Sequence, residues 1–272
     1  MSDPAPTAAP RPSAEWNASD YHRLSNPHVT WGRRVLDRLP LRGDETAVDA
    51  GCGTGRLTAD LLERLPRGRV IAVDQSLNML IEAEATLRPR FGDRVEFVQS
   101  DLLALSLPEP VDAIFSTATF HWIADHDALF ARLFDLLRPG GRLVAQCGGG
   151  PNLAALLARF AESTADAQYR DVFAGWPGPW LFADDAQTAD RLSSVGFVDV
   201  ATDLEEAPTT MPDALTYRDF LETVILRSHL ERIPTERARD ALLNRLTERA
   251  AADPVPFHLD YWRLNHAGRR PT

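Results

Sequence analysis

The sequence contains few cysteines, and the two that it has form no recognisable pattern. Cys52 and Cys147 lie far apart, and neither is surrounded by residues at the spacing of metal ligands. We therefore expect no disulfide scaffold and no metal site, and the cysteine usage favours a reducing compartment.

Long apolar runs and an excess of positive charge are also missing. No apolar run reaches transmembrane length, and the N-terminus lacks the apolar segment of a signal peptide. The 29 Lys and Arg residues are outnumbered by 39 Asp and Glu residues, which gives a formal net charge of −10. Because nucleic acids and anionic membranes bind through clustered cations, we expect neither as a partner. The sequence predicts a soluble cytoplasmic protein and leaves its oligomeric state open.

The 272 residues suffice for one large α/β domain, and 44% of them are hydrophobic, enough for a full core. Residues 1–14 are rich in proline, alanine and serine and are predicted to form a disordered leader. We expect residues 15–272 to form a single domain. Two mostly helical insertions, at about 151–190 and 211–252, should project from it as a cap.

Strand-like and helical patterns alternate through the first half of this domain. This alternation, with short connections, predicts a parallel sheet covered by helices on both faces. After a polar, aromatic short helix or flap at 16–25, helices are expected at 29–39, 56–65, 76–87, 124–137, 153–169 and 186–195, and in segments over 212–251. Strands are expected at 46–49, 69–74, 95–99, 111–116, 142–146, 197–204 and 258–265.

The most informative segment, residues 48–56, joins the first expected strand to a helix. It places Gly51, Gly53 and Gly55 at every second position, so a ligand can sit on main-chain N–H groups at the start of the helix. Asp49 stands at the end of the strand. A carboxylate there repels a pyrophosphate but attracts an ammonium or sulfonium group, which favours S-adenosylmethionine as the ligand.

Further polar residues follow the next strands, where open α/β sheets bind ligands. Asp74 ends the second strand and can accept hydrogen bonds from both hydroxyls of a ribose. Asp101 and Leu102 follow the third strand, where the acid can accept a hydrogen bond from the adenine amine. Residues from Ser116 to Trp122 follow the fourth strand and should face the reacting end of the cofactor. Asp74 could otherwise cap a helix, and Asp101 could form an Asx turn.

Two other nucleotide sites fit less well. The dinucleotide fingerprint Gly-x-Gly-x-x-Gly requires glycine at position 56, where this chain has Arg56, so an NAD-dependent reductase is disfavoured. No Gly-Lys-Ser/Thr follows the turn, which excludes a phosphate-binding P-loop. A protein that binds the cofactor or its demethylated product without turnover remains an alternative.

Several motifs resemble those of class I S-adenosylmethionine-dependent methyltransferases. Residues 48–55 are similar to the first motif of that family, residues 72–76 to the second, and residues 137–143 to the turn before strand five. More narrowly, the chain resembles the trans-aconitate methyltransferases over roughly residues 15–270, notably at 16–21 and 122–126. The pair His121-Trp122 is more similar to juvenile hormone acid methyltransferases. Both groups methylate carboxylates.

The resemblance implies a fold and a set of site residues. The fold is α/β, with a seven-stranded, mostly parallel, doubly wound (Rossmann-like) sheet whose last strand is antiparallel, and with a helical cap. The cofactor contacts that it implies are Asp49, Gly51 and Gly53 with the methionine end, Asp74 and Gln75 with the ribose, Asp101 and Leu102 with the adenine, and Tyr21 closing over the methionine end.

We expect the acceptor to be a small, hydrophobic molecule that is methylated on a carboxylate oxygen. A carbon or nitrogen acceptor is the alternative. His121 would stand beside the methyl group, as a base for an alcohol or amine or as a donor that aims a carboxylate. His121 could instead cap the following helix or pack beside Trp122. Trp122 itself is either a cation–π partner of the sulfonium or a residue of the hydrophobic core.

An aromatic, proline-rich loop includes Trp176 and Trp180. These side chains either wall the acceptor pocket or pin the loop as a local cluster. Arg227 and Arg232 of the predicted cap could bind a polyanionic acceptor, or could lie on a solvated helix face.

Overall fold

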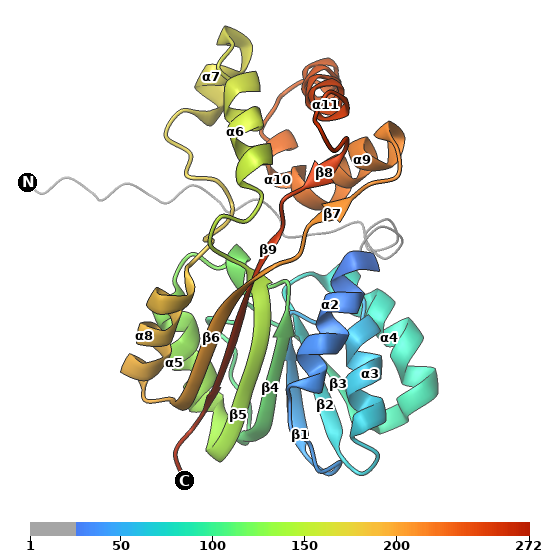
Figure 1. Ribbon diagram of the computed structural model, residues 1–272. Helices are drawn as coiled ribbons and strands as arrows, with labels where there is room; N and C mark the ends of the chain where they lie inside the picture. Colours follow the sequence, from blue (N-terminus) through green and yellow to red (C-terminus); the bar gives the residue numbers. More distant parts are fainter. Residues whose placement is uncertain (1–25) are drawn as a thin grey trace, which may run out of the picture.

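A computed structural model describes residues 26–272, and a seven-stranded sheet forms its centre (Figure 1). The strands are β1 (Thr46–Ala50), β2 (Arg69–Asp74), β3 (Val95–Gln99), β4 (Val111–Thr117), β5 (Leu137–Gly148), β6 (Val198–Glu206) and β9 (Trp262–Arg269). Their order is β3-β2-β1-β4-β5-β9-β6. The first five strands pair in parallel, and β9 is antiparallel to both β5 and β6. The predicted seven-stranded, mostly parallel sheet is confirmed. The leader, the segment at 16–25 and Tyr21 lie outside the described residues.

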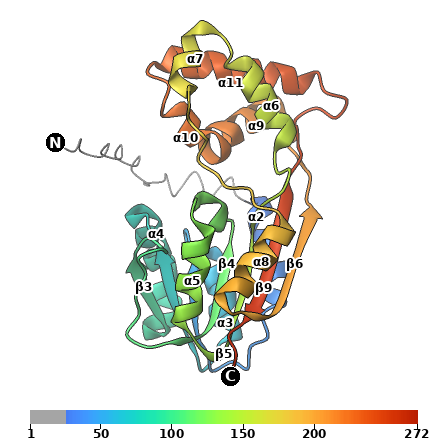
Figure 2. The same ribbon diagram turned by 90° about the vertical axis from the view of Figure 1, so that its left-hand side faces the viewer.

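Helices cover both faces of the sheet (Figures 1 and 2). One layer contains α2 (Asn26–Asp37), α3 (Arg56–Arg64) and α4 (Leu77–Phe91), and the other contains α5 (His126–Leu136) and α8 (Asp185–Val195). Each helix buries an apolar stripe, for example Leu61 and Leu62 of α3 and Leu129 and Leu133 of α5. Each such leucine contributes roughly 1.5–3 kcal/mol by leaving water. The inner strands β1, β2 and β4 are buried on both sides, which is why they are mostly apolar.

Three helices that pack on the sheet, α4, α5 and α8, begin at residues whose side chains accept a hydrogen bond from the first turn. Ser76 accepts a hydrogen bond from the main-chain N–H of Met79 at the start of α4. Asp125 caps α5 and Asp184 caps α8 in the same way. These caps satisfy N–H groups that have no partner within the helix, and they fix where each helix begins after its strand.

A helical cap lies beyond the carboxyl ends of the parallel strands (Figures 1 and 2). It contains α6 (Ala154–Ser163), α7 (Ala167–Phe173), α9 (Ala214–Phe220), the π-helix η3 (Leu221–Ile225), α10 (Arg227–Leu230) and α11 (Glu236–Ala251). A short antiparallel ribbon of β7 (Thr209–Thr210) and β8 (His258–Leu259) leads to it. The cap has its own core, in which Tyr169, Tyr217 and Phe220 are fully buried.

Several element boundaries differ from the prediction, and for three elements the difference is large. β5 begins at Leu137 rather than at residue 142, because residues 138–141 bulge out of a ladder in which Val111 pairs with Leu137 and Ala113 with Arg142. The helix expected over 153–169 is divided into α6 and α7. The strand expected over 258–265 is divided because β8 pairs with β7, whereas β9 joins the main sheet.

Two further observations concern the layers. The helix α8, which overlaps the cap insertion expected at 151–190, packs against α5 and β6 in the sheet layer. Between residues 26 and 272, none of the helices has the length and apolar character required to cross a bilayer.

Candidate functional site

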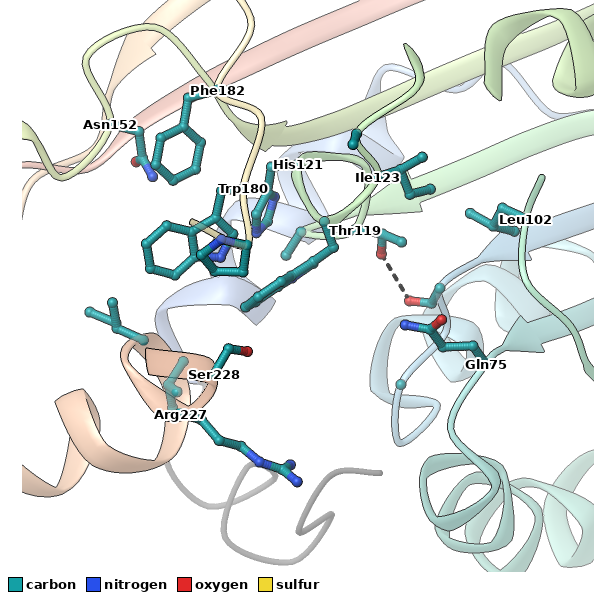
Figure 3. A pocket seen from close by; sticks show the side chains of 18 of the residues that line it. Gln75, Leu102, Thr119, His121, Ile123, Asn152, Trp180, Phe182, Arg227 and Ser228 are labelled. Carbon is teal, nitrogen blue, oxygen red and sulfur yellow. Dashed lines mark hydrogen bonds between the residues drawn. The ribbon is translucent and has the colours of Figure 1, made fainter. Parts of the chain in front are cut away.

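A cavity of about 1210 Å³ lies between the carboxyl ends of the parallel strands and the cap. Figure 3 shows Gln75 and Leu102 on one side of it and His121, Asn152, Trp180 and Phe182 on the other. We call these sides the glycine-turn end and the cap end. The predicted site residues that line the cavity are Gly51, Gly53, Asp74, Gln75, Asp101, Leu102, His121, Trp122, Trp176 and Trp180.

The glycine turn is held by main-chain bonds and presents bare backbone to the cavity. The N–H groups of Gly51 and Cys52 donate to the carbonyl of Val73, at 2.8 and 2.9 Å. A Cβ on Gly51 would lie 2.1 Å from Oγ1 of Thr119, so no larger residue fits there. Gly53 has a φ of +53° and no atom within 4 Å of its Cβ position. The turn is therefore open above Gly53, as a ligand that contacts the backbone requires.

Asp74 joins the turn to the start of α4. One carboxylate oxygen accepts from the N–H of Gly53 and the other from the N–H of Ser76, both at 2.9 Å. These bonds fix the carboxylate at the cavity wall. Asp101, one strand further along, accepts from the N–H of Leu103 at 2.9 Å and thus forms the Asx turn that was the alternative interpretation. It nevertheless lines the cavity, beside Leu102.

Asp49 and Ser116 are not among the residues that line the cavity. Asp49 is only 2% exposed and accepts from the hydroxyl of Thr58 at 2.6 Å. Burial raises the pKa of Asp49 to about 7, and the nearby charge of Asp74 adds to the shift. Ser116 donates to the carbonyl of Ala50 at 2.6 Å. Asp49 thus links β1 to α3, and Ser116 links β4 to β1, beneath the glycine turn.

Main-chain N–H groups hold both the ring and the carbonyl of His121. It is 9% exposed, and its Nδ1 accepts from the N–H of Gly148 at 3.2 Å. A ring nitrogen that accepts carries no proton, so the neutral ring carries its proton on Nε2. The carbonyl of His121 accepts from the N–H of Leu181 at 2.9 Å, which ties the aromatic loop to this segment. The side-chain cap of α5 comes from Asp125 rather than from His121.

The tryptophans of the aromatic loop belong to a local aromatic cluster and also line the cavity. Trp180 packs edge-on against Trp122 at 5.6 Å between ring centroids and stacks on Phe182 at 5.4 Å. Trp176 contacts His229 of α10 at 4.8 Å, and Trp180 contacts the same ring at 5.0 Å. The cluster therefore pins the loop to the cap and also walls the cap end of the cavity (Figure 3).

Several polar residues that line the cavity were not predicted, among them the buried Arg263 and Asn152. Arg263 of β9 is 3% exposed, lies over the ring of Trp31 at 4.9 Å, and points Nε toward Oε1 of Gln146 at 3.5 Å. Asn152 is also buried, and its Oδ1 accepts from the N–H of Trp262 at 2.9 Å. Arg263 lies in a strand that also carries Asn265 and His266, so no local pattern marked it, and none marked Asn152.

The cap arginines that the sequence offered for a polyanion also border the cavity. Arg227 pairs with Glu231 at 2.9 Å, one helical turn further on. Arg232 lies over the ring of Trp176 at 4.7 Å and donates to the carbonyl of Val172. Within the part of the chain that the structure describes, no group of three or more His, Cys, Asp or Glu residues could hold a metal ion.

The chain is similar to known methyltransferases. Residues 47–141 match the family described as "Methyltransferase domain". The trans-aconitate 2-methyltransferase of Deinococcus radiodurans is 30% identical over 80% of this chain and 83% of that protein, and that of Acidovorax sp. is 30% identical over 86% and 88%. The alignment with the Azoarcus sp. relative, 40% identical, covers about half of each protein.

Solved structures show the same fold at lower identity. Mycolic acid cyclopropane synthase CmaA1 has a TM-score of 0.62 at 16% identity, covering 95% of this chain and 96% of that one. A Haemonchus contortus phosphoethanolamine N-methyltransferase has a TM-score of 0.60 at 20% identity, covering 94% and 57%.

The sheet order, the open glycine turn and the fixed carboxylate of Asp74 define a class I S-adenosylmethionine-dependent methyltransferase. Within that class, the alignments that cover 80% or more of both proteins show that the chain belongs to the trans-aconitate 2-methyltransferase family.

Proposed function

We propose that the protein transfers the methyl group of S-adenosylmethionine to a carboxylate oxygen of a small molecule with an apolar body. The names of its relatives, which are methyltransferases of trans-aconitate, support a carboxylate acceptor. The hydrogen bond from Gly148 to His121 is the structural observation that carries the proposal. Cytoplasmic location belongs to the same proposal and is supported by two buried, unpaired cysteines.

The glycine-turn end fits the cofactor. The carboxylate of Asp74, held by the N–H groups of Gly53 and Ser76, lines the cavity with Gln75 beside it, where it can face the hydroxyls of a ribose. In this proposal Asp101 and Leu102 frame the adenine. Gly51 and Gly53 hold the methionine end, and Tyr21, outside the described residues, remains a prediction for the same end. When bound, S-adenosylmethionine supplies an activated methyl group.

Asp49 is proposed to act from beneath the turn rather than as a direct ligand. Because its pKa is raised to about 7, the buried carboxyl is only partly ionised at neutral pH. A cationic ligand above the turn favours the ionised form, and Thr58 holds that form with a hydrogen bond. Ser116 acts in the same layer by fixing β4 to the end of β1.

His121 is proposed to orient the acceptor and not to deprotonate it. A carboxylate is ionised at neutral pH and needs no base, whereas an alcohol or amine acceptor would usually benefit from one. The ring nitrogen that could act as a base, Nδ1, accepts the N–H of Gly148, and the proton of the neutral ring lies on Nε2. In this tautomer, Nε2–H of His121 can donate a hydrogen bond to the carboxylate that is methylated.

The cap end is proposed to hold the body of the acceptor and to exclude water. Trp122, Trp180 and Phe182 supply aromatic surface there, and Val224 and Ile225 of η3 supply aliphatic surface. Methyl transfer from a sulfonium depends chiefly on alignment and on exclusion of competing water. An apolar wall beside an N–H donor serves both requirements.

The proposal is tested by incubating the enzyme with methyl-labelled S-adenosylmethionine and a panel of acids: trans-aconitate, phenylacetate and decanoate, each beside its amide and its alcohol. We expect mass spectrometry to find the label as a methyl ester of an acid. His121→Phe removes the Nε2–H donor and is expected to slow turnover by about tenfold or more, with cofactor affinity little changed. Label found in the alcohols, the amides or on carbon, and in none of the acids, would contradict the proposal.

A further inference from the structure

We infer that Asn152 and Arg263, together with His121, form an anion-binding site for the carboxylate of the acceptor, built around Gly148. This inference rests on the proposed function and names the groups that would select its substrate class. All three residues line the cavity at its cap end.

Gly148, the last residue of β5, is the common neighbour of the three side chains. Its N–H donates to Nδ1 of His121 at 3.2 Å. A Cβ at this position would lie 2.8 Å from Nδ2 of Asn152, so that amide rests directly on the glycine. Across the β5–β9 ladder, Gly148 is the register partner of Arg263. Three separate segments of the chain therefore meet at one residue at the end of the sheet.

The amide of Asn152 is oriented by the backbone. Its Oδ1 accepts from the N–H of Trp262 at 2.9 Å, so its NH2 group is the part that lies over Gly148. Figure 3 shows Asn152 beside Phe182, on the same side of the cavity as His121. The residue therefore offers a donor at the cap end, as does the Nε2–H of His121.

The guanidinium of Arg263 is oriented by a chain of buried amides. Asp203 accepts from Nδ2 of Asn265 at 2.8 Å, which turns Oδ1 of Asn265 toward Nε2 of Gln146, at 2.7 Å. Gln146 then presents Oε1 to Nε of Arg263 at 3.5 Å. Because a carboxylate fixes one end of this chain, each amide can take only one orientation.

The chemistry of the three groups points to an anion. His121, Asn152 and Arg263 all present N–H donors, and Arg263 adds a positive charge at 3% exposure. Arginine can meet a carboxylate with two parallel hydrogen bonds, and the two N–H donors of His121 and Asn152 are neutral groups that suit the same ligand.

The test measures binding of acids to the enzyme loaded with S-adenosylhomocysteine, which requires no turnover. The wild-type protein is titrated by calorimetry with trans-aconitate, phenylacetate and decanoate, and the acid bound most tightly is used with the variants. We expect Arg263→Gln and Asn152→Asp each to weaken binding by about tenfold or more, and Arg263→Lys to weaken it less. Asn152→Asp keeps an acceptor for the N–H of Trp262.

Arg269→Gln is the matched control. Arg269 lies on the same strand and pairs with the exposed Asp199, away from the cavity, so acid binding should not change. Unchanged affinity for S-adenosylhomocysteine shows that each variant is folded. In turnover, Arg263→Gln should raise KM for the acid more than it lowers kcat.

Two results would overturn the inference: acid affinity in Arg263→Gln equal to wild type, or no binding of any acid to the loaded wild-type enzyme. Binding of an acid without methyl transfer to it contradicts the proposed function instead and leaves the anion site supported. The two hypotheses therefore fail on different measurements.

Discussion

His266 is a histidine enclosed in the sheet layer without polar contacts. It is 2% exposed and stacks on Phe120 at 5.5 Å, and neither ring nitrogen has a hydrogen-bond partner in the described part of the chain. Burial lowers the pKa of His266 to about 3, and the charge of the neighbouring His126 adds to the shift. His126 itself donates to the carbonyl of Phe120, the residue before His121.

This histidine should make the protein sensitive to acid. Its folded pKa lies below the unfolded value of 6.5, so the unfolded chain takes up the proton first and stability is lost as pH falls from 6.5 toward 3. Between pH 7.5 and pH 5, we expect the free energy of unfolding of wild type to fall by about 2 kcal/mol more than that of His266→Phe. Urea unfolding at the two pH values measures the difference.

Two other buried groups also make the stability of both proteins depend on pH. His229, with its pKa lowered to about 4, gives a loss of the same sign in both proteins. Asp49 acts in the opposite direction, because its raised pKa contributes stability at low pH that is lost as pH rises through 7. Identical pH dependence of wild type and His266→Phe would contradict the assignment to His266.

At the residue scale, Asp74 and Asp101 stand where strands end in turns, and both line the cavity. Their contacts with a cofactor stay predictions. Asp49 stands just before the turn in a strand that is buried on both faces, so apolar alternation could not show to which side it points. Arg263 and Asn152 depend on pairings between distant segments, which no local motif records.

At the scale of elements, α4 follows the turn after Asp74 that contains Gln75. The helix begins at Leu77, and the buried hydroxyl of Ser76 accepts a hydrogen bond from the N–H of Met79 at 3.3 Å. The N-cap residue Ser76 therefore fixes the first turn of α4, and the loop before this helix lines the cavity.

Removing this helix cap should cost stability. We expect Ser76→Ala to lower the free energy of unfolding by about 1 kcal/mol, because the N–H of Met79 loses its acceptor. Urea denaturation with an unchanged m-value is the measurement. Ser193→Ala, at an exposed position within α8, is the control and should change stability by less than about 0.5 kcal/mol. Equal effects of the two changes would show that the cap at Ser76 contributes little.

Element boundaries were predicted where the residue at the boundary is itself typical of a helix end. Ser76 and Gly196 mark such ends in the sequence, and α4 and α8 start and stop beside them. The division of residues 153–169 was not predicted, although the polar stretch 161–168 contains the end of α6 and the start of α7. It is marked by Thr164, whose hydroxyl donates back to the carbonyl of Phe160. The split between β8 and β9 depends on a partner strand some fifty residues away, which periodicity does not reveal.

At the scale of the whole molecule, one cavity is shared by the sheet layer and the cap. A ligand bound at its glycine-turn end should raise the stability of the folded chain by mass action. At a concentration of S-adenosylhomocysteine about 100 times its Kd, the expected gain is about 2.7 kcal/mol, seen as a rise in Tm.

Asp74→Asn tests whether this gain depends on the cavity wall. The change keeps the size of the side chain but removes the charge that holds Gly53 and Ser76. We expect a smaller rise in Tm at the same ligand concentration, as for a lost charged hydrogen bond. Asp135→Asn, exposed on α5, should retain the full rise. A full rise in Asp74→Asn would remove Asp74 from the binding site.

The cap is assembled from two stretches of chain that leave the sheet at different strands. Residues 154–173 follow β5, and residues 214–251 are inserted between β7 and β8. Their interiors interlock, since Leu156 and Phe160 of the first stretch share one core with Leu242 and Leu246 of the second. Neither stretch alone can be exchanged with that of a relative without leaving its counterpart mismatched. To give one family member the acceptor preference of another, both stretches have to be replaced together while the sheet is left unaltered.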